Sequence, residues 1–146
     1  MALANFALNH LRSHPEIYFG PLGFSHADLA TKIALDALVL RSTSIGIHHV
    51  CDWWLVHSDQ DWLEAKMPTN EIRNSFFRLI AFSELKMNFT MSHTLSTAFC
   101  ADVATFCAAS VHFEVISGNL SSEIRDACTS VCKQGRAIMF RGLFVV

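Results

Sequence analysis

The sequence predicts an α+β fold in which helices pack on a small mixed or antiparallel sheet. Its 146 residues match the size of one domain, so we treat residues 1–146 as a single globular unit. Apolar residues recur at helical spacing in some segments, whereas other segments are short runs of β-branched and aromatic residues typical of strands. The two kinds of segment follow one another without regular strand–helix–strand alternation, which favours α+β over a parallel α/β sheet.

The amino-terminal half predicts helices followed by a hairpin. A short first helix precedes an irregular stretch, residues 14–24, which holds two prolines and two glycines. Ser25 is a favourable N-cap with Asp28 at the capping-box position, and the apolar stripe that follows predicts a helix to about Leu40. Residues 45–57 predict two strands joined by a turn at Cys51-Asp52. This hairpin would place His48 opposite Leu55, His49 opposite Trp54, and His57 near Gly46.

The carboxy-terminal half predicts a mixture of helices and strands. Ser58 and Asp61 form a second capping box, which predicts a short helix through about Lys66. The pattern of residues 71–82 leaves helix and extended chain as alternatives. The remaining predicted elements are a helix over 92–109, a strand over 111–116, a helix over 121–134 stopped by Gly135, and a strand over 137–146 with Gly142 inside it.

Composition argues against membrane and nucleic-acid partners. The formal net charge of -2 lacks the basic field of a nucleic-acid-binding protein. Hydrophobic residues make up 51% of the chain, but no apolar run approaches the ~20 residues of a membrane span, and the amino terminus does not resemble a signal peptide. Four of the five cysteines lie on apolar stripes and are expected to be reduced and buried, as in a cytoplasmic protein: Cys100, Cys107, Cys128 and Cys132.

No motif for catalysis or for a cofactor is complete. The chain has no G-x-S-x-G elbow, no G-x-x-x-x-G-K-[ST] loop and no G-x-G-x-x-G fingerprint. Cys128 and Cys132 have a spacing that a helix can use for zinc, but no second ligand pair lies nearby. The predicted hairpin does not bring three histidine or cysteine ligands to one point. We therefore expect a non-enzymatic protein without a cofactor or metal.

Residues 45–63 combine acids and aromatic residues and form the best candidate for a partner-binding surface. An acidic patch accelerates association with a basic partner, and tryptophan is enriched at interface hot spots. The candidate partner-binding residues are Asp52, Asp59, Asp61, Trp62 and Glu64, a role for which Trp62 would have to be exposed. Tryptophans of a hairpin pack more often in cores than at interfaces, so the core is the expected place of Trp53 and Trp54 and also the favoured place of Trp62.

The segment LRSHPEIYFGPLGFSHADLATKIALDAL, residues 11–38, resembles the opening of the ATPase domain of the gyrase B subunit. The resemblance implies a nucleotide-binding fold, and it extends through the strands to about residue 63. Lys32 and Asp36 stand where that family has its catalytic glutamate and its magnesium-binding asparagine. Asp59-Gln60-Asp61-Trp62-Leu63 replaces the family's Asp-x-Gly-x-Gly loop. This resemblance therefore implies a degenerate nucleotide-binding domain that has lost its ATPase chemistry.

A second resemblance rests on W-W-x-V-x-S-D-x-D-W-L over residues 53–63 and on F-R-x-I-x-F over residues 77–82. Both are similar to segments of short bacterial proteins encoded beside polymorphic toxins of the contact-dependent growth inhibition type. This second resemblance implies a cytoplasmic immunity protein whose partner is a cognate toxin protein. A nuclease is one candidate class of toxin. A homo-oligomeric scaffold is a further alternative, in which a homodimer pairs through the apolar carboxy-terminal strand: Phe140, Leu143, Phe144, Val145 and Val146.

Overall fold

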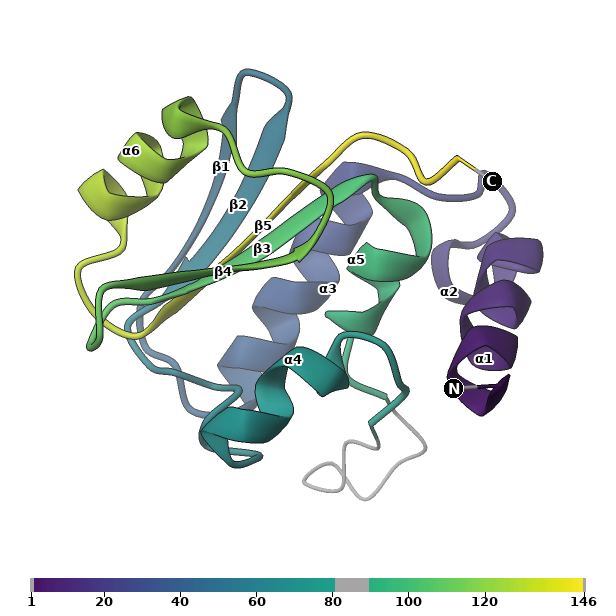
Figure 1. Ribbon diagram of the computed structural model, residues 1–146, viewed down its shortest axis with the longest axis horizontal. Coiled ribbons are helices and arrows are strands. Elements are labelled where there is room, and N and C mark those ends of the chain that lie inside the picture. The colour runs from purple at the N-terminus through teal and green to yellow at the C-terminus, as the bar shows by residue number, and fades with distance from the viewer. Residues whose placement is uncertain (1, 81–89, 146) are drawn as a thin grey trace.

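The protein has an α+β fold, as predicted, in which helices cover both faces of a five-stranded antiparallel sheet (Figure 1). The structure is a computed structural model that describes residues 2–80 and 90–145. The helices are α1 (Ala2–Ser13), α2 (Pro15–Phe19), α3 (His26–Val39), η1 (Thr69–Glu71), α4 (Ile72–Ser75), α5 (Thr94–Phe99) and α6 (Ser122–Val131). The strands are β1 (Ile45–Val50), β2 (Trp53–Ser58), β3 (Asp102–Cys107), β4 (His112–Ser117) and β5 (Arg136–Arg141).

The last strand in the sequence is the central strand of the sheet. The strand order is β1-β2-β5-β3-β4, so β5 is hydrogen-bonded to β2 on one side and to β3 on the other. The strand predicted over 137–146 ends earlier than expected, because β5 stops before Gly142, which has a φ of 72°. Because both sides of β5 are occupied and Phe140 is fully buried, this strand cannot pair across a dimer as the sequence suggested.

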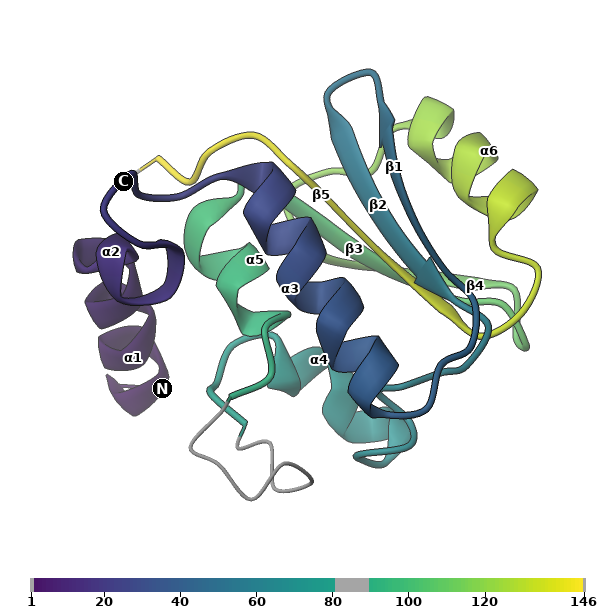
Figure 2. The same ribbon diagram turned by 180° about the vertical axis from the view of Figure 1, so that it is seen from behind.

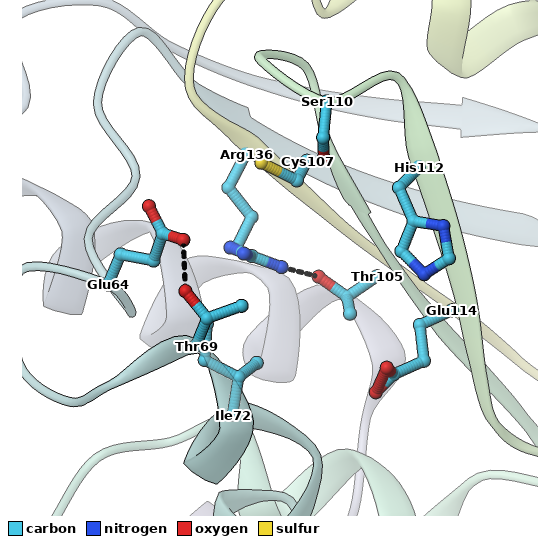
Figure 3. Close-up of a pocket in the computed structure, with 9 residues that line it drawn as sticks. All are labelled: Glu64, Thr69, Ile72, Thr105, Cys107, Ser110, His112, Glu114 and Arg136. Atoms are coloured by element: carbon cyan, nitrogen blue, oxygen red, sulfur yellow. Dashed lines mark hydrogen bonds between the residues drawn. The ribbon is translucent and has the colours of Figure 1, made fainter.

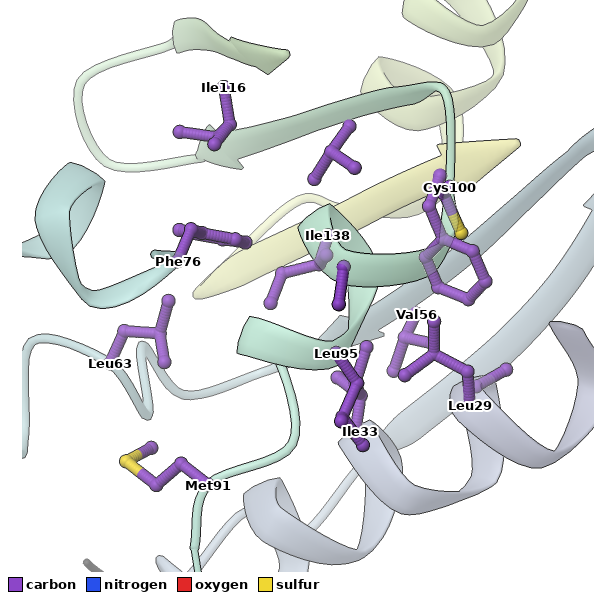
Figure 4. Packing of buried hydrophobic residues seen from close by; sticks show 14 of the residues in the cluster. Leu29, Ile33, Val56, Leu63, Phe76, Met91, Leu95, Cys100, Ile116 and Ile138 are labelled. Carbon is purple, nitrogen blue, oxygen red and sulfur yellow. The ribbon is translucent and has the colours of Figure 1, made fainter. Parts of the chain in front are cut away.

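Helices lie on both faces of the sheet (Figure 2), and an apolar layer holds them against it on each face. Val56 and Ile138 point towards α3 and α5, where Leu29, Ile33 and Leu95 complete the larger layer (Figure 4). The alternate residues of the same strands point towards α6. That smaller layer contains Trp53, Leu55, Ala104, Phe106, Ile124, Cys128 and Met139.

The hairpin and the capped helix agree with their predictions. The β1–β2 register pairs His48 with Leu55, His49 with Trp54 and Gly46 with His57, and Cys51-Asp52 forms the turn. Cys51 adopts a φ of 54°, as a tight turn without glycine requires. At the start of α3, the Ser25 side chain accepts a hydrogen bond from the Asp28 backbone N–H.

Other predicted boundaries are wrong. The helix expected over 92–109 ends at Phe99, because residues 103–106 form a central strand that is buried on both faces and therefore lacks the alternation that identifies a half-exposed strand. Residues 59–67 form turns rather than a helix, and 14–24 include α2. The helix α6 ends at Val131, before Gly135. Of the ambiguous residues 71–82, Ile72–Ser75 are helical, and residues 81 and 82 lie outside the described part of the chain.

The cysteines are free, and three of the four expected core cysteines are fully buried. Burial raises the pKa of Cys100 and Cys128 to about 12 and that of Cys132 to about 11, which keeps these thiols protonated. Cys107 is half-buried on β3. No helix in residues 2–80 and 90–145 is long and apolar enough to cross a membrane.

Candidate functional site

A buried ion pair fixes the loop after β2 to the central strand. Arg136, the first residue of β5, donates from Nε to Asp61 Oδ1 at 2.6 Å and from Nη2 to Asp61 Oδ2 at 2.8 Å. Its Nη1 donates to Thr105 Oγ1 on β3 at 2.9 Å. The Arg136 side chain is only 4% exposed and that of Asp61 is 14% exposed. This bidentate, charge-assisted geometry makes the pair a rigid part of the structure.

A small pocket opens above Arg136, between the loop after β2 and the β3–β4 edge of the sheet (Figure 3). Its volume is about 80 Å³, well below the roughly 300–1,000 Å³ of typical small-molecule sites. It has room for the end of one amino-acid side chain. Its lining residues are Glu64, Thr69, Ile72, Thr105, Cys107, Ser110, His112, Glu114 and Arg136.

Two carboxylates stand on opposite sides of this pocket. Glu64 lies on the side of η1, and its Oε1 accepts a hydrogen bond from Thr69 Oγ1 at 2.6 Å. Glu114 projects from β4 on the other side (Figure 3), with its side chain 34% exposed. Arg73 approaches Glu114 at 3.9 Å but uses the same Nη1 to donate to the Val115 carbonyl at 2.7 Å. Each rim carboxylate thus has one protein partner, Thr69 or Arg73, and remains accessible to solvent above a floor whose cation is paired with Asp61.

The predicted partner-binding residues do not form one continuous surface. Asp52 is in the hairpin turn, at the opposite end of β2 from Asp59. Asp59 accepts hydrogen bonds from the Thr43 hydroxyl at 2.6 Å and from the Thr43 and Ser44 backbone N–H groups. These bonds, led by the Thr43 hydroxyl, lower the pKa of Asp59 and tie it to the loop before β1.

Trp62 lies in the core, so it cannot serve as one of the partner-binding residues. Its side chain is 0% exposed and belongs to the apolar layer beneath α3. Turns place Trp62 beside Leu63, which is equally buried, so the indole contributes to the core and not to a binding surface. Of the five predicted residues, Glu64 and Asp61 are brought to the pocket region, Glu64 at the rim and Asp61 beneath it.

The side chains that sequence reasoning missed are Arg136, His112 and Glu114. Arg136 and Glu114 come from strands that the sequence did not associate with the acidic loop. The alternation of His112, Glu114 and Ile116 on a predicted strand could have indicated that the first two share one face. Nothing local in the sequence indicates that this face meets the loop after β2.

The pocket does not present an aligned nucleophile and base. Cys107 and His112 are cross-strand partners. However, the Cys107 sulfur points towards Arg136 and away from the imidazole (Figure 3), and no hydrogen bond joins the two side chains in the described structure. His93 packs deeper, fully buried, where burial and the charge of Arg136 lower its pKa to about 3. A histidine that stays neutral and is shielded from solvent cannot exchange protons with a bound substrate.

Asp36 stands at the position that the gyrase resemblance assigned to the magnesium ligand. Its side chain is 8% exposed and accepts a hydrogen bond from the Ser92 backbone N–H at 2.5 Å. Burial raises the pKa of Asp36 to about 7, against the lowering effects of Ser92 and of Lys32. The carboxylate thus anchors the segment before α5 to α3.

Comparisons with protein-family models, with curated proteins and with solved structures found no match to this chain. Within the described residues, no group of three or more histidine, cysteine, aspartate or glutamate side chains could hold a metal ion.

Proposed function

We propose that this chain is a non-catalytic immunity protein that binds and neutralises a cognate bacterial toxin in the cytoplasm. The pocket above Arg136 is its central contact, and Glu64 and Glu114 receive a lysine or arginine side chain of the toxin there. The observation that carries the proposal is the pair of accessible carboxylates on opposite sides of a pocket sized for one side-chain end.

The charges of the pocket favour a basic guest. The floor guanidinium is held by two carboxylate oxygens of Asp61, so it does not attract an anion as a free arginine would. An entering ammonium or guanidinium group would be attracted by both rim carboxylates and could donate a charge-assisted hydrogen bond to either of them. Such a group, desolvated in a pocket, is typical of interface hot spots.

A basic partner fits a toxin that acts on nucleic acid, because the substrate cleft of such an enzyme is positively charged. Acidic groups placed to enter that cleft accelerate association and exclude the substrate from the same surface. Inhibition therefore needs no chemistry from the immunity protein. It needs a rigid surface, and the Asp61–Arg136 pair supplies a fixed floor.

The direct test is co-expression with the toxin domain encoded beside this chain. We expect relief of toxicity and a stable complex in a pull-down with the tagged chain. The double variant Glu64→Gln/Glu114→Gln should weaken both effects. The matched control, Glu16→Gln/Asp126→Asn, removes two acids outside the pocket and should behave as wild type.

Two outcomes would contradict the proposal. A wild-type chain that neither captures the toxin nor relieves its toxicity removes the function. A complex that forms equally well with the pocket variant and the control keeps the function but shows that the pocket is not the contact. Circular dichroism of both variants establishes that they are folded.

A further inference from the structure

Two histidine rings meet on the α6 side of the β1–β2 hairpin. The register pairs Gly46 with His57 and His48 with Leu55, so the two histidines are diagonal neighbours on adjacent strands. Paired residues share a face of the sheet, and this face is the one on which Leu55 packs against α6. The His48 and His57 Nε2 atoms are 3.0 Å apart, and the ring planes differ by 22°.

Gly46 provides the space in which these nitrogens meet. A Cβ atom at position 46 would lie 2.2 Å from His57 Nε2 and 3.0 Å from His48 Nε2. Gly46 does not have the positive φ that makes glycine necessary elsewhere in the chain, so the backbone conformation does not demand it. The absence of a side chain is what allows both Nε2 atoms to approach above the strand.

The separation matches that of two ligands on one metal ion. Zinc–imidazole bonds of about 2.0–2.1 Å, at ligand angles of roughly 90–110°, place two nitrogens about 2.9–3.4 Å apart. A neutral imidazole is the form that binds a metal. Both rings are half-buried, so the hairpin positions them before an ion arrives.

We propose that His48 and His57 form a two-histidine chelate for one divalent transition metal ion of the zinc class. An open pocket beside His57 leaves access for the ion and for the waters that complete its coordination. That pocket has a volume of about 360 Å³ and is lined by Ser44, His57, Asp59, Val131, Lys133 and Gln134. An ion held by only two protein ligands exchanges with the solution, whereas a closed four-ligand structural site retains its ion. This site is independent of the proposed toxin contact.

The test is a zinc titration monitored by competition with a chromophoric chelator. His14→Gln is the parent protein, because the His10 and His14 ring centroids are 4.8 Å apart and could hold a second ion. We expect one ion per chain with micromolar affinity, and at least roughly tenfold weaker binding in His48→Gln and in His57→Gln. His49→Gln is the matched control, because His49 stacks on Trp54 at 4.3 Å on the other face. It should bind like the parent.

Two further measurements keep the test decisive. Gly46→Ala retains both imidazoles but removes their meeting space, and it should lose binding to the same degree. In nitrogen-detected NMR of the parent, zinc addition should shift the ring signals of two histidines. This measurement does not require any variant to fold. The proposal is overturned if zinc up to about 1 mM leaves these signals unchanged. It is also overturned if His48→Gln and His57→Gln bind as tightly as His49→Gln. The two rings would then be joined by a hydrogen bond only.

Discussion

Removing the charge of Asp36 is expected to raise the free energy of unfolding relative to the wild type, and this gain should grow as the pH rises. Burial raises the pKa of this carboxyl from 3.8 to about 7, so the folded state holds a proton that the unfolded state releases between these values. Stability then falls with rising pH, because the folded state binds more protons. The stability that Asp36 contributes through its raised pKa is fully present below about pH 4 and is lost as the pH rises through about 7.

The magnitude follows from the proton difference. The two states differ by nearly one proton between about pH 5 and about pH 6 and by half a proton at about pH 7, so the wild type loses up to about 1.4 kcal/mol per pH unit, or about 3 kcal/mol between about pH 5 and about pH 8. Asp36→Asn removes this loss while its side-chain oxygen still accepts the Ser92 N–H. Urea unfolding at about pH 5 and about pH 8 should show the variant gaining about 3 kcal/mol on the wild type.

Asp52→Asn, at the exposed hairpin turn, controls for the loss of one negative charge. The prediction fails if wild type and Asp36→Asn lose the same free energy of unfolding between the two pH values. Equal losses would mean that Asp36 is ionised in the folded protein at both.

Two further predictions concern other charged contacts. Asp61→Asn leaves the buried guanidinium of Arg136 without its counter-charge and should lower the free energy of unfolding by about 3–5 kcal/mol, measured by urea unfolding; a loss below about 1 kcal/mol would mean that solvent reaches the pair. Cys51 donates its S–H to Glu123 Oε2 at 3.3 Å, and this bond raises the Cys51 pKa. Glu123→Gln should therefore accelerate alkylation of Cys51 by iodoacetamide, and an unchanged rate would show that this contact is not formed in solution.

Local chemistry explains which elements could be predicted from the sequence. The Ser25 cap is a contact between residues three apart, and the β1–β2 register is set by a two-residue turn. Both contacts depend on neighbours in the chain, so the hydrophobic pattern and the residue propensities suffice to predict them. The prediction of β3 failed because the residues of this strand face two apolar layers at once. The helices that cover those layers include α3 and α6, which are not neighbours of β3 in the chain.

The candidate site was only partly predictable for the same reason. Glu64 lies in the acid-rich segment, but the residues opposite and beneath it, Glu114 and Arg136, arrive from strands about 50 and 70 residues later. Trp62 was a candidate for the surface because its neighbours are acidic. The turns after β2 instead bury Trp62 and Leu63 together and leave Gln60 and Glu64 exposed.

In the proposed complex, the pocket between Glu64 and Glu114 binds a basic side chain of the toxin. The most direct test is titration calorimetry of the purified toxin domain with the wild type, the pocket variant Glu64→Gln/Glu114→Gln and the control variant. We expect the pocket variant to bind at least tenfold more weakly, about 1.4 kcal/mol, and the control to bind like the wild type. Equal affinity of all three proteins, or no binding by the wild type, would contradict the account.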